Sequence, residues 1–381
     1  MQWSVRILLN PVIVRLLIYG VNPIDLEYVL TKVEKLPLVN GKVLEKTWLD
    51  EWNKKSSYYV ELAKEAESKK NTVTARELYA LASKCDYACY LISSDDIESK
   101  RAVYKQLEKT YRKQTEYFEN EVEYTEIPFR DAKVLPAYIH YPDKNKFKAP
   151  YPVAIIFAGM GSCKEELNTL TLPLVERGIA VVACDQPGTG SALFDYDIKL
   201  KAHEIELAFE KIMDAVAANN KLDENKVCSY GLCMGGGYAY RFSVKDTRVK
   251  CCVNLFPLFI GKISPDKLPR WMKSGKWALF QTGEIEKEED YYSEMSVLEE
   301  GSFSCDYLLV HGMYDNWMAP EACEHMFDKA SGLKEKIVAE QPPVFSTGEA
   351  ITHTMPVGEQ LHWLKHTVSD WIAEHLDRKD D

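Results

Sequence analysis

The sequence predicts an α/β protein with a mostly parallel sheet flanked by helices, preceded by a helical N-terminal region. From residue 1 to about 120, apolar residues recur at intervals of three and four, which is typical of amphipathic helices. From about 121 to the end, short runs that are apolar on both faces alternate with helical segments. Such runs are typical of a parallel sheet that helices cover on both sides. A chain of 381 residues is long enough for both regions.

The first apolar stretch, residues 5–20, raises the question of membrane contact. Arg6, Asn10, Pro11 and Arg15 interrupt it, and it is shorter than the roughly 20 apolar residues that a spanning helix needs. We therefore expect a buried or oligomer-forming helix and no membrane contact.

Three long amphipathic helices are predicted next, at residues 47–70, 72–92 and 95–118. Threonines are suitable residues near the starts of the first two, at Thr47 and at Thr72 or Thr74. Cys85 and Cys89 lie four residues apart on one face of the second helix. Because no second pair has the spacing of metal ligands, we interpret them as core residues and expect no metal.

The pattern changes near residue 121. Residues 122–142 alternate like two antiparallel strands. Buried strands are then predicted at 152–159, 178–185, 226–231, 249–256 and 306–312. The segment 258–302 breaks the rhythm and is rich in Trp, Tyr and Met. We expect it to be a lid insertion over the carboxyl edge of the sheet, where folds of this class bind ligands.

Composition narrows the function classes. The net charge is -11 and no long Lys/Arg cluster is present, which argues against nucleic-acid binding. The ten cysteines are scattered, several lie in apolar strand-like runs, and no secretory signal precedes them. This distribution favours free thiols in a reducing, cytoplasmic setting.

The segment around Cys233 carries the strongest chemical signal. A strand ending near residue 230 is followed by Gly231, Cys233 and Gly235 and then by a helix. This is the context of a G-x-S-x-G nucleophile elbow, with cysteine in the place of serine. The two glycines suit a turn too sharp for side chains, and the positive end of the following helix favours a thiolate. A small core cysteine is the alternative interpretation.

A thiolate nucleophile needs a base and an acid that orients it, in the chain order nucleophile, acid, histidine. Asp315 follows the strand 306–312 at its carboxyl end and is the predicted acid, whereas Asp306 lies at the opposite end of that strand. His353 is the predicted base because it lies in a loop before the final helix. His362 is the main alternative, and it falls on that helix with His366 and His375.

An oxyanion hole would complete the site. One donor is expected to be the main-chain N–H of Met234, and the other that of Met160 or Gly161 in the loop after the strand 152–159. Cys163 in the same loop lacks the elbow context and is expected to open a helix. The Gly-rich loop 185–192 lacks the Walker spacing and lysine of a phosphate site, so we interpret it as a structural turn near the active site.

Together these segments resemble the α/β-hydrolase group that contains dihydroxypseudooxynicotine hydrolase, the fermentation-respiration switch protein and the fungal polyketide-shortening hydrolases. The likeness is carried by the helical segments, "IIFAGMGSCKEE", "ERGIAVVACDQPGTGSA" and the elbow with its downstream Asp and His. It implies a homodimer with an α/β-hydrolase catalytic domain at 121–381 and a helical cap and dimerisation domain at 1–120. By position, Cys233, Asp315 and His353 would form the triad, with cysteine for serine as in dienelactone hydrolases.

The expected reaction is cleavage of an ester, a thioester or a ketone-adjacent C–C bond through a thioester acyl-enzyme, with no cofactor. Trp271, Trp277, Tyr291 and Tyr292 in the lid would favour a small apolar or aromatic substrate, although simple packing explains them equally well. Release of the acyl group by an amine, alcohol or carbanion would make the protein an acyltransferase or cyclase. A carrier-protein or coenzyme A thioester would then suit as donor. A non-catalytic binding protein is the third possibility.

Overall fold

The computed structural model describes residues 5–36, 41–93, 96–259, 295–313, 315, 317–339, 353, 355–356 and 358–378. These residues divide between Glu119 and Asn120 into two compact units. The predicted functions of the first unit as a cap and as a dimerisation domain stay predictions.

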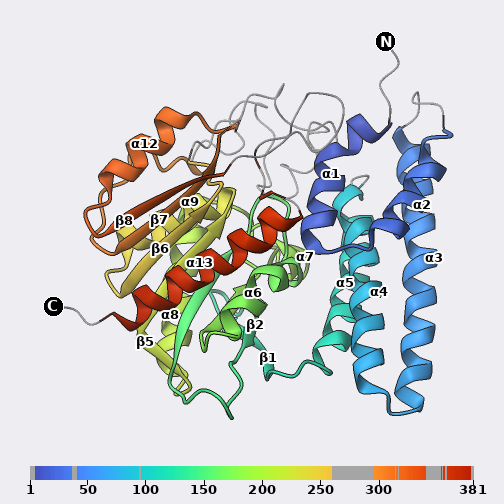
Figure 1. Ribbon diagram of the computed structural model, residues 1–381, viewed down its shortest axis with the longest axis horizontal. Coiled ribbons are helices and arrows are strands. Elements are labelled where there is room, and N and C mark those ends of the chain that lie inside the picture. Colours follow the sequence, from blue (N-terminus) through green and yellow to red (C-terminus); the bar gives the residue numbers. More distant parts are fainter. Residues whose placement is uncertain are drawn as a thin grey trace. The chain divides into compact units, whose positions relative to one another are not determined.

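The first unit is helical, as the apolar periodicity predicted. The side chain of Asn22 caps α2 by accepting from the N–H of Ile24 and Asp25, and Asp96 caps α5 through the N–H of Ser99. Helices α3, α4 and α5 pack side by side (Figure 1). The bounds are α1 Val5–Tyr19, α2 Pro23–Val33, α3 Gly41–Ser68, α4 Thr72–Ile92 and α5 Ile97–Thr115.

The three predicted long helices are confirmed, although α3 begins at Gly41, before the predicted start at Thr47. Helix α1 packs on α2 and α4, and Leu16 in it is fully buried. Of the helices in the described residues, none combines the length with the apolar character needed to cross a bilayer. Cys85 and Cys89 are buried free thiols of α4.

The second unit contains one sheet of eight strands in the order β1-β2-β4-β3-β5-β6-β7-β8. Strands β1 and β2 form the predicted antiparallel pair, and β2 also runs antiparallel to β4. The other neighbours are parallel. The bounds are β1 Val122–Pro128, β2 Val134–His140, β3 Tyr151–Phe157, β4 Ala180–Cys184, β5 Leu222–Leu232, β6 Val249–Leu255, β7 Asp306–Gly312 and β8 Lys334–Ala339. Every predicted strand is confirmed, and β8 is an edge strand that the sequence pattern did not indicate.

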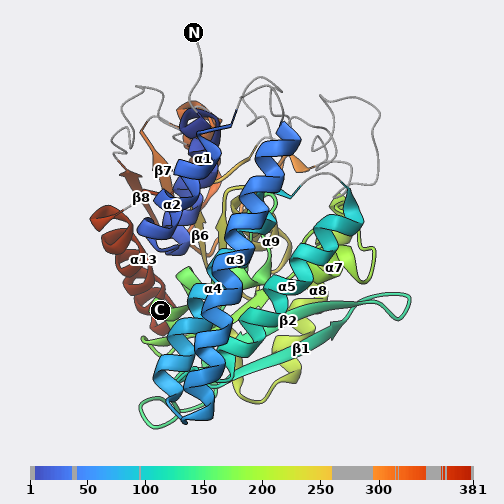
Figure 2. The same cartoon turned by 90° about the vertical axis from the view of Figure 1, so that its right-hand side faces the viewer.

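Helices cover both faces of this sheet (Figures 1 and 2). Helices α6 and α13 pack together on one face, and α8 and α9 pack together on the other. The rings of Phe157, Phe209 and Phe242 join β3, α8 and α9 in one aromatic cluster, with centroids 5.0–5.7 Å apart. The bounds are α6 Asn168–Val175, α7 Gly190–Phe194, α8 Ala202–Ala218, α9 Met234–Lys245, α12 Pro320–Lys329 and α13 Glu359–Asp377.

The predicted lid insertion at 258–302 lies largely outside the described residues. The helix expected to open at Cys163 is a 3-10 turn at Lys164–Leu167 followed by α6. Cys163 precedes this turn at its N-cap position.

Candidate active site

Cys233 lies at the sharp turn between β5 and α9, with φ 57° and ψ -123°. A positive φ is uncommon for any residue other than glycine. The flanking glycines make the turn sterically possible. A Cβ on Gly231 would lie 1.9 Å from the carbonyl oxygen of Gly235, and a Cβ on Gly235 would lie 2.1 Å from that of Phe157. The local sequence therefore specifies an elbow with the cysteine at its tip.

Main-chain hydrogen bonds fix this elbow to the carboxyl end of β6. The N–H of Cys233 donates to the carbonyl of Leu255 at 3.0 Å, and the N–H of Leu258 donates to the carbonyl of Cys233 at 2.8 Å. Cys233 itself is partly exposed. The main chain of the elbow is therefore anchored to the sheet.

The structure brings Asp315, His353 and Cys233 together in one chain of contacts. Nδ1 of His353 lies 2.7 Å from Oδ2 of Asp315, and Nε2 lies 3.2 Å from Sγ of Cys233. The side chains of His353 and Asp315 are 1% and 3% exposed. With Nδ1–H donating to the carboxylate, Nε2 faces the sulfur and can exchange a proton with it.

Trp317 is a neighbour of this site that sequence reasoning missed. Its ring stacks on the imidazole of His353, with centroids 4.8 Å apart and planes 16° apart. The N–H groups of Trp317 and Met318 donate to Oδ1 of Asp315 at 2.8 and 3.1 Å. One short loop thus holds the carboxylate and covers one face of the imidazole.

The electrostatics favour a thiolate and an imidazolium. Burial alone would raise the pKa of Cys233, but the charge and hydrogen bond of His353 lower that pKa below its ordinary value. Hydrogen bonds from the main chain of Met160 and Met234 act in the same direction. Burial would lower the pKa of His353, whereas Cys233 and Asp315 raise it to about 10. Both shifts favour the thiolate and imidazolium over the neutral thiol and imidazole.

The other nine cysteines differ from Cys233 in this respect. All ten lie in described residues and none forms a disulfide. Burial raises the pKa of each of the nine. Cys305 is the informative comparison because it is also partly exposed, yet its pKa is raised.

The main chains of Met234 and Met160 hydrogen-bond to Cys233; Met160 and Gly161 were the two alternatives for the second donor. Met234 is the first residue of α9, and Met160 lies in the loop after β3. Gly161 follows Met160 with φ +68°. A Cβ on Gly159 would lie 3.1 Å from Cβ of Cys233, so the absence of a side chain lets this loop approach the elbow closely.

The rival residues lie in other environments. His362 is exposed on α13 with its ring 4.6 Å from that of His366. Cys163 is fully buried. Asp306 begins β7 and contacts Arg378, at the strand end opposite to Asp315.

Two further expectations concern ligands. The predicted substrate-binding residues Trp271, Trp277, Tyr291 and Tyr292 lie outside the described residues. In the part of the chain that the structure describes, no group of three or more His, Cys, Asp or Glu side chains is arranged to hold a metal.

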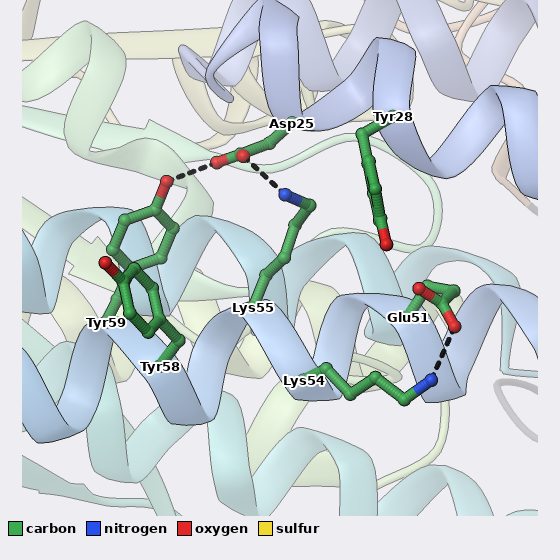
Figure 3. Close-up of a pocket in the computed structure, with 7 residues that line it drawn as sticks. All are labelled: Asp25, Tyr28, Glu51, Lys54, Lys55, Tyr58 and Tyr59. Atoms are coloured by element: carbon green, nitrogen blue, oxygen red, sulfur yellow. Dashed lines mark hydrogen bonds and ion pairs between the residues drawn. The ribbon is translucent and has the colours of Figure 1, made fainter.

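The helical unit contains a separate hollow of about 240 Å³ between α2 and α3 (Figure 3). Asp25 accepts hydrogen bonds from Lys55 at 2.6 Å and from Tyr59 at 2.5 Å, and Lys54 pairs with Glu51. Because these charges pair with one another, we assign no ligand to this hollow. Its lining residues are Asp25, Tyr28, Glu51, Lys54, Lys55, Tyr58 and Tyr59.

Comparison with known proteins gives one family match and several relatives. A model described as the prolyl oligopeptidase family matches residues 166–378. The α/β hydrolase xenA of Xenoacremonium sinensis is 28% identical over 236 residues, 59% of this chain and 54% of that protein. The 2,6-dihydropseudooxynicotine hydrolase of Paenarthrobacter nicotinovorans is 24% identical over 208 residues, 55% of this chain and 54% of that protein.

A solved structure of 2,6-dihydroxy-pseudo-oxynicotine hydrolase matches with a TM-score of 0.77 at 18% identity, over 95% of both chains. These findings confirm the predicted α/β-hydrolase fold and the predicted resemblance. The chain spans about half the length of the curated relatives it matches.

Proposed function

Because this chain is an α/β hydrolase that belongs to the prolyl oligopeptidase family, we propose that Cys233 is its nucleophile, His353 its general base and Asp315 the residue that orients the base. One observation carries the proposal. Of ten cysteines, the one at the elbow lies 3.2 Å from an imidazole nitrogen, and its pKa alone is lowered.

In the first step the thiolate of Cys233 attacks the carbonyl carbon of the substrate, and the π electron pair moves onto oxygen. The N–H groups of Met160 and Met234 donate to this oxyanion. When the tetrahedral intermediate collapses, the bond to the leaving group breaks, and the imidazolium of His353 gives its Nε2 proton to the departing atom. A thioester on Cys233 and a neutral imidazole result.

In the second step water attacks the thioester carbonyl and Nε2 of His353 takes a proton from it. The same main-chain donors stabilise the second oxyanion. Its collapse expels the sulfur of Cys233 as a thiolate, and the carboxylic acid leaves. Asp315 fixes the tautomer of His353 and stabilises its charged form in both steps. The resting ion pair is regenerated.

The proposed substrate is a small apolar or aromatic molecule with an ester, a thioester or a C–C bond next to a ketone. Thiolates exchange readily with thioesters, so carrier-bound and coenzyme A thioesters belong in the tested set. One relative is a hydrolase of 2,6-dihydropseudooxynicotine by name, which makes heteroaromatic ketones a further class to test.

Iodoacetamide at neutral pH tests the nucleophile. We expect one carbamidomethyl group per chain, located at Cys233 by peptide mapping. The matched control is Cys305→Ala, because Cys305 is the other partly exposed cysteine. This variant should keep the fast label and Cys233→Ala should lose it. Equal labelling rates at Cys305 and Cys233 would contradict an activated thiolate.

Intact mass after mixing with aryl esters and acyl thioesters tests the acyl-enzyme. We expect one acyl group on the wild-type protein and none on Cys233→Ala. The acyl group should then be released as the free acid. Release by an added amine or alcohol and not by water would replace hydrolysis with acyl transfer. If no substrate acylates a protein whose Cys233 alkylates quickly, catalysis through an acyl-enzyme is refuted.

A further inference from the structure

The Gly-rich loop after β4, residues 185–191, contacts the loop after β3 at both of its ends. Gln186 is 3% exposed and makes two hydrogen bonds to Ala158. Its Oε1 accepts from the N–H of Ala158 at 3.1 Å, and its Nε2 donates to the carbonyl of Ala158 at 2.9 Å. The side-chain amide therefore holds the first residue of the loop 158–164 as a neighbouring strand would.

Asp185 holds the other end of the same loop. Its Oδ1 accepts from the N–H of Lys164 at 2.9 Å, and its Oδ2 lies 2.7 Å from Nζ of Lys164. Both side chains are 0% exposed. Oδ2 also accepts from the N–H of Ser191 at 2.9 Å. A buried charge pair with several hydrogen bonds is costly to break on one side, so this end of the loop is firmly held.

The carboxylate of Asp185 is itself tightly enclosed. A Cβ on Gly190, where φ is +45°, would lie 2.1 Å from Oδ1 of Asp185. A side chain at this position would thus displace the carboxylate. The glycine pattern of the loop, which could be mistaken for a phosphate site, has a steric reason in this contact.

The segment between the two held ends is rich in glycine. Met160 lies between Gly159 and Gly161, and the N–H of Ser162 closes a turn onto the carbonyl of Gly159 at 3.2 Å. Glycines lose more conformational freedom on folding than other residues, so this segment depends on external contacts for a single conformation. Asp185 and Gln186, which are adjacent in the loop after β4, supply such contacts.

We propose that Asp185 and Gln186 are positioning residues that fix the loop 158–164 so that the N–H of Met160 points at the developing oxyanion. This inference rests on the proposed function. It assigns to the 185–191 loop a role in the reaction, beyond that of a structural turn.

Two reactions of the same sulfur separate this role from general stability. Acylation of Cys233 by an aryl ester passes through an oxyanion, whereas alkylation by iodoacetamide displaces iodide at a saturated carbon and forms none. Loss of one oxyanion donor costs roughly 10²–10³-fold in rate. Both rates are compared at a pH where Cys233 is fully ionised, because the N–H of Met160 also helps to lower the pKa of Cys233. In Gln186→Met, which has similar volume and no amide, we expect ester acylation to fall roughly 10–100-fold and alkylation to change less than about threefold.

The control variant is Ser243→Ala, which removes buried hydrogen bonds to Ser229 at 2.6 Å and to the carbonyl of Ala239 at 2.9 Å. Ser243→Ala should lower the melting temperature about as much as Gln186→Met does. Its ratio of acylation rate to alkylation rate should nevertheless equal that of the wild-type protein. Gln186→Glu adds a chemical readout. Its carboxylate repels the carbonyl of Ala158, and protonation restores a donor, so the ratio should recover as the pH falls.

If Gln186→Met leaves the acylation-to-alkylation ratio unchanged, whether both rates stay the same or fall equally, the inference is wrong and the proposed function remains intact. If the unmodified protein forms no acyl-enzyme, the proposed function and the inference fall together. Asp185→Asn should lower the ratio as well. A folded Asp185→Asn protein with the unmodified ratio would remove Asp185 from the proposal.

Discussion

Replacing Gly159 with alanine should slow acylation while leaving the protein folded. A Cβ at this position would lie 3.1 Å from Cβ of Cys233, 3.3 Å from the carbonyl oxygen of Leu232 and 3.7 Å from the sulfur. Ordinary van der Waals contact begins at 3.4 Å, so the loop and the elbow must separate by about 0.3 Å (3.4 minus 3.1). Gly159 does not have a positive φ that would add backbone strain.

The size of the effect follows from the position of Met160, the next residue. Oxyanion donors act over about 2.7–3.1 Å, and losing one costs roughly 10²–10³-fold in kcat. A shift of about 0.3 Å takes up most of that range, so we expect kcat to fall roughly 10–100-fold with KM little changed. Overpacking of this kind costs about 1–3 kcal/mol of unfolding free energy.

Two assays test this prediction: stopped-flow measurement of the burst of product from an aryl ester, and thermal unfolding. Alanine variants of two other glycines serve as controls. A Cβ on Gly301 would meet Cγ1 of Val244 at 3.5 Å, an ordinary contact, so Gly301→Ala should behave like the unmodified protein. A Cβ on Gly235 would lie 2.1 Å from the main-chain oxygen of Phe157, so Gly235→Ala should not fold. A Gly159→Ala protein with full kcat would refute the reasoning.

Three further outcomes are expected. His353→Ala removes the charge and hydrogen bond that lower the pKa of Cys233 and leaves the burial that raises it; alkylation at pH 7 should fall at least about 30-fold, and an unchanged rate-against-pH profile would count against the ion pair. Trp317→Leu removes the ring stacked on His353, so the alkylation profile should move to higher pH by about half a unit, with Trp317→Phe close to the unmodified protein. Burial raises the pKa of Asp86 to about 6 from 3.8, so the folded protein holds this proton more tightly than the unfolded chain and loses stability as pH rises from about 4 to 6. Asp86→Asn should therefore raise the unfolding free energy by about 3 kcal/mol at pH 8 and by little at pH 4, as thermal melts would show.

The elbow could be predicted because residues that are adjacent in the sequence determine its geometry. A turn in which a Cβ would come within 1.9 Å of a neighbouring carbonyl requires glycine at Gly231, and the strand and helix on either side have clear apolar patterns. The place of Asp315 follows from the strand before it. Local sequence therefore suffices wherever a short-range steric demand fixes the residue type.

Strand β8 shows why the edge of the sheet escaped prediction. It carries Lys334, Glu335 and Lys336 in succession, and its register is set by main-chain pairing with β7, as in His311 opposite Val338. An edge strand of this kind has one covered side, so charges are tolerated and the apolar run that marks a central strand is missing.

Trp317 and Gln186 escaped for a different reason. Trp317 stacks on a histidine 36 residues later, and Gln186 bonds to a residue 28 positions earlier. No periodicity links such partners, because the fold alone brings their loops to the same edge of the sheet. Supporting residues of this sort become visible with coordinates.

The positive φ of Cys233 links the stability of the fold to the proposed reaction. Cys233 has φ 57°, and holding a non-glycine residue in this region costs of order 1–3 kcal/mol; under the proposed function, the sulfur is the reason that this residue is not glycine. Glycine would relax the backbone and remove the proposed nucleophile, so we expect a Cys233→Gly protein to melt at a higher temperature than the wild type and to form no acyl-enzyme. If Cys233 is the nucleophile, stability and activity place opposite demands on this one residue.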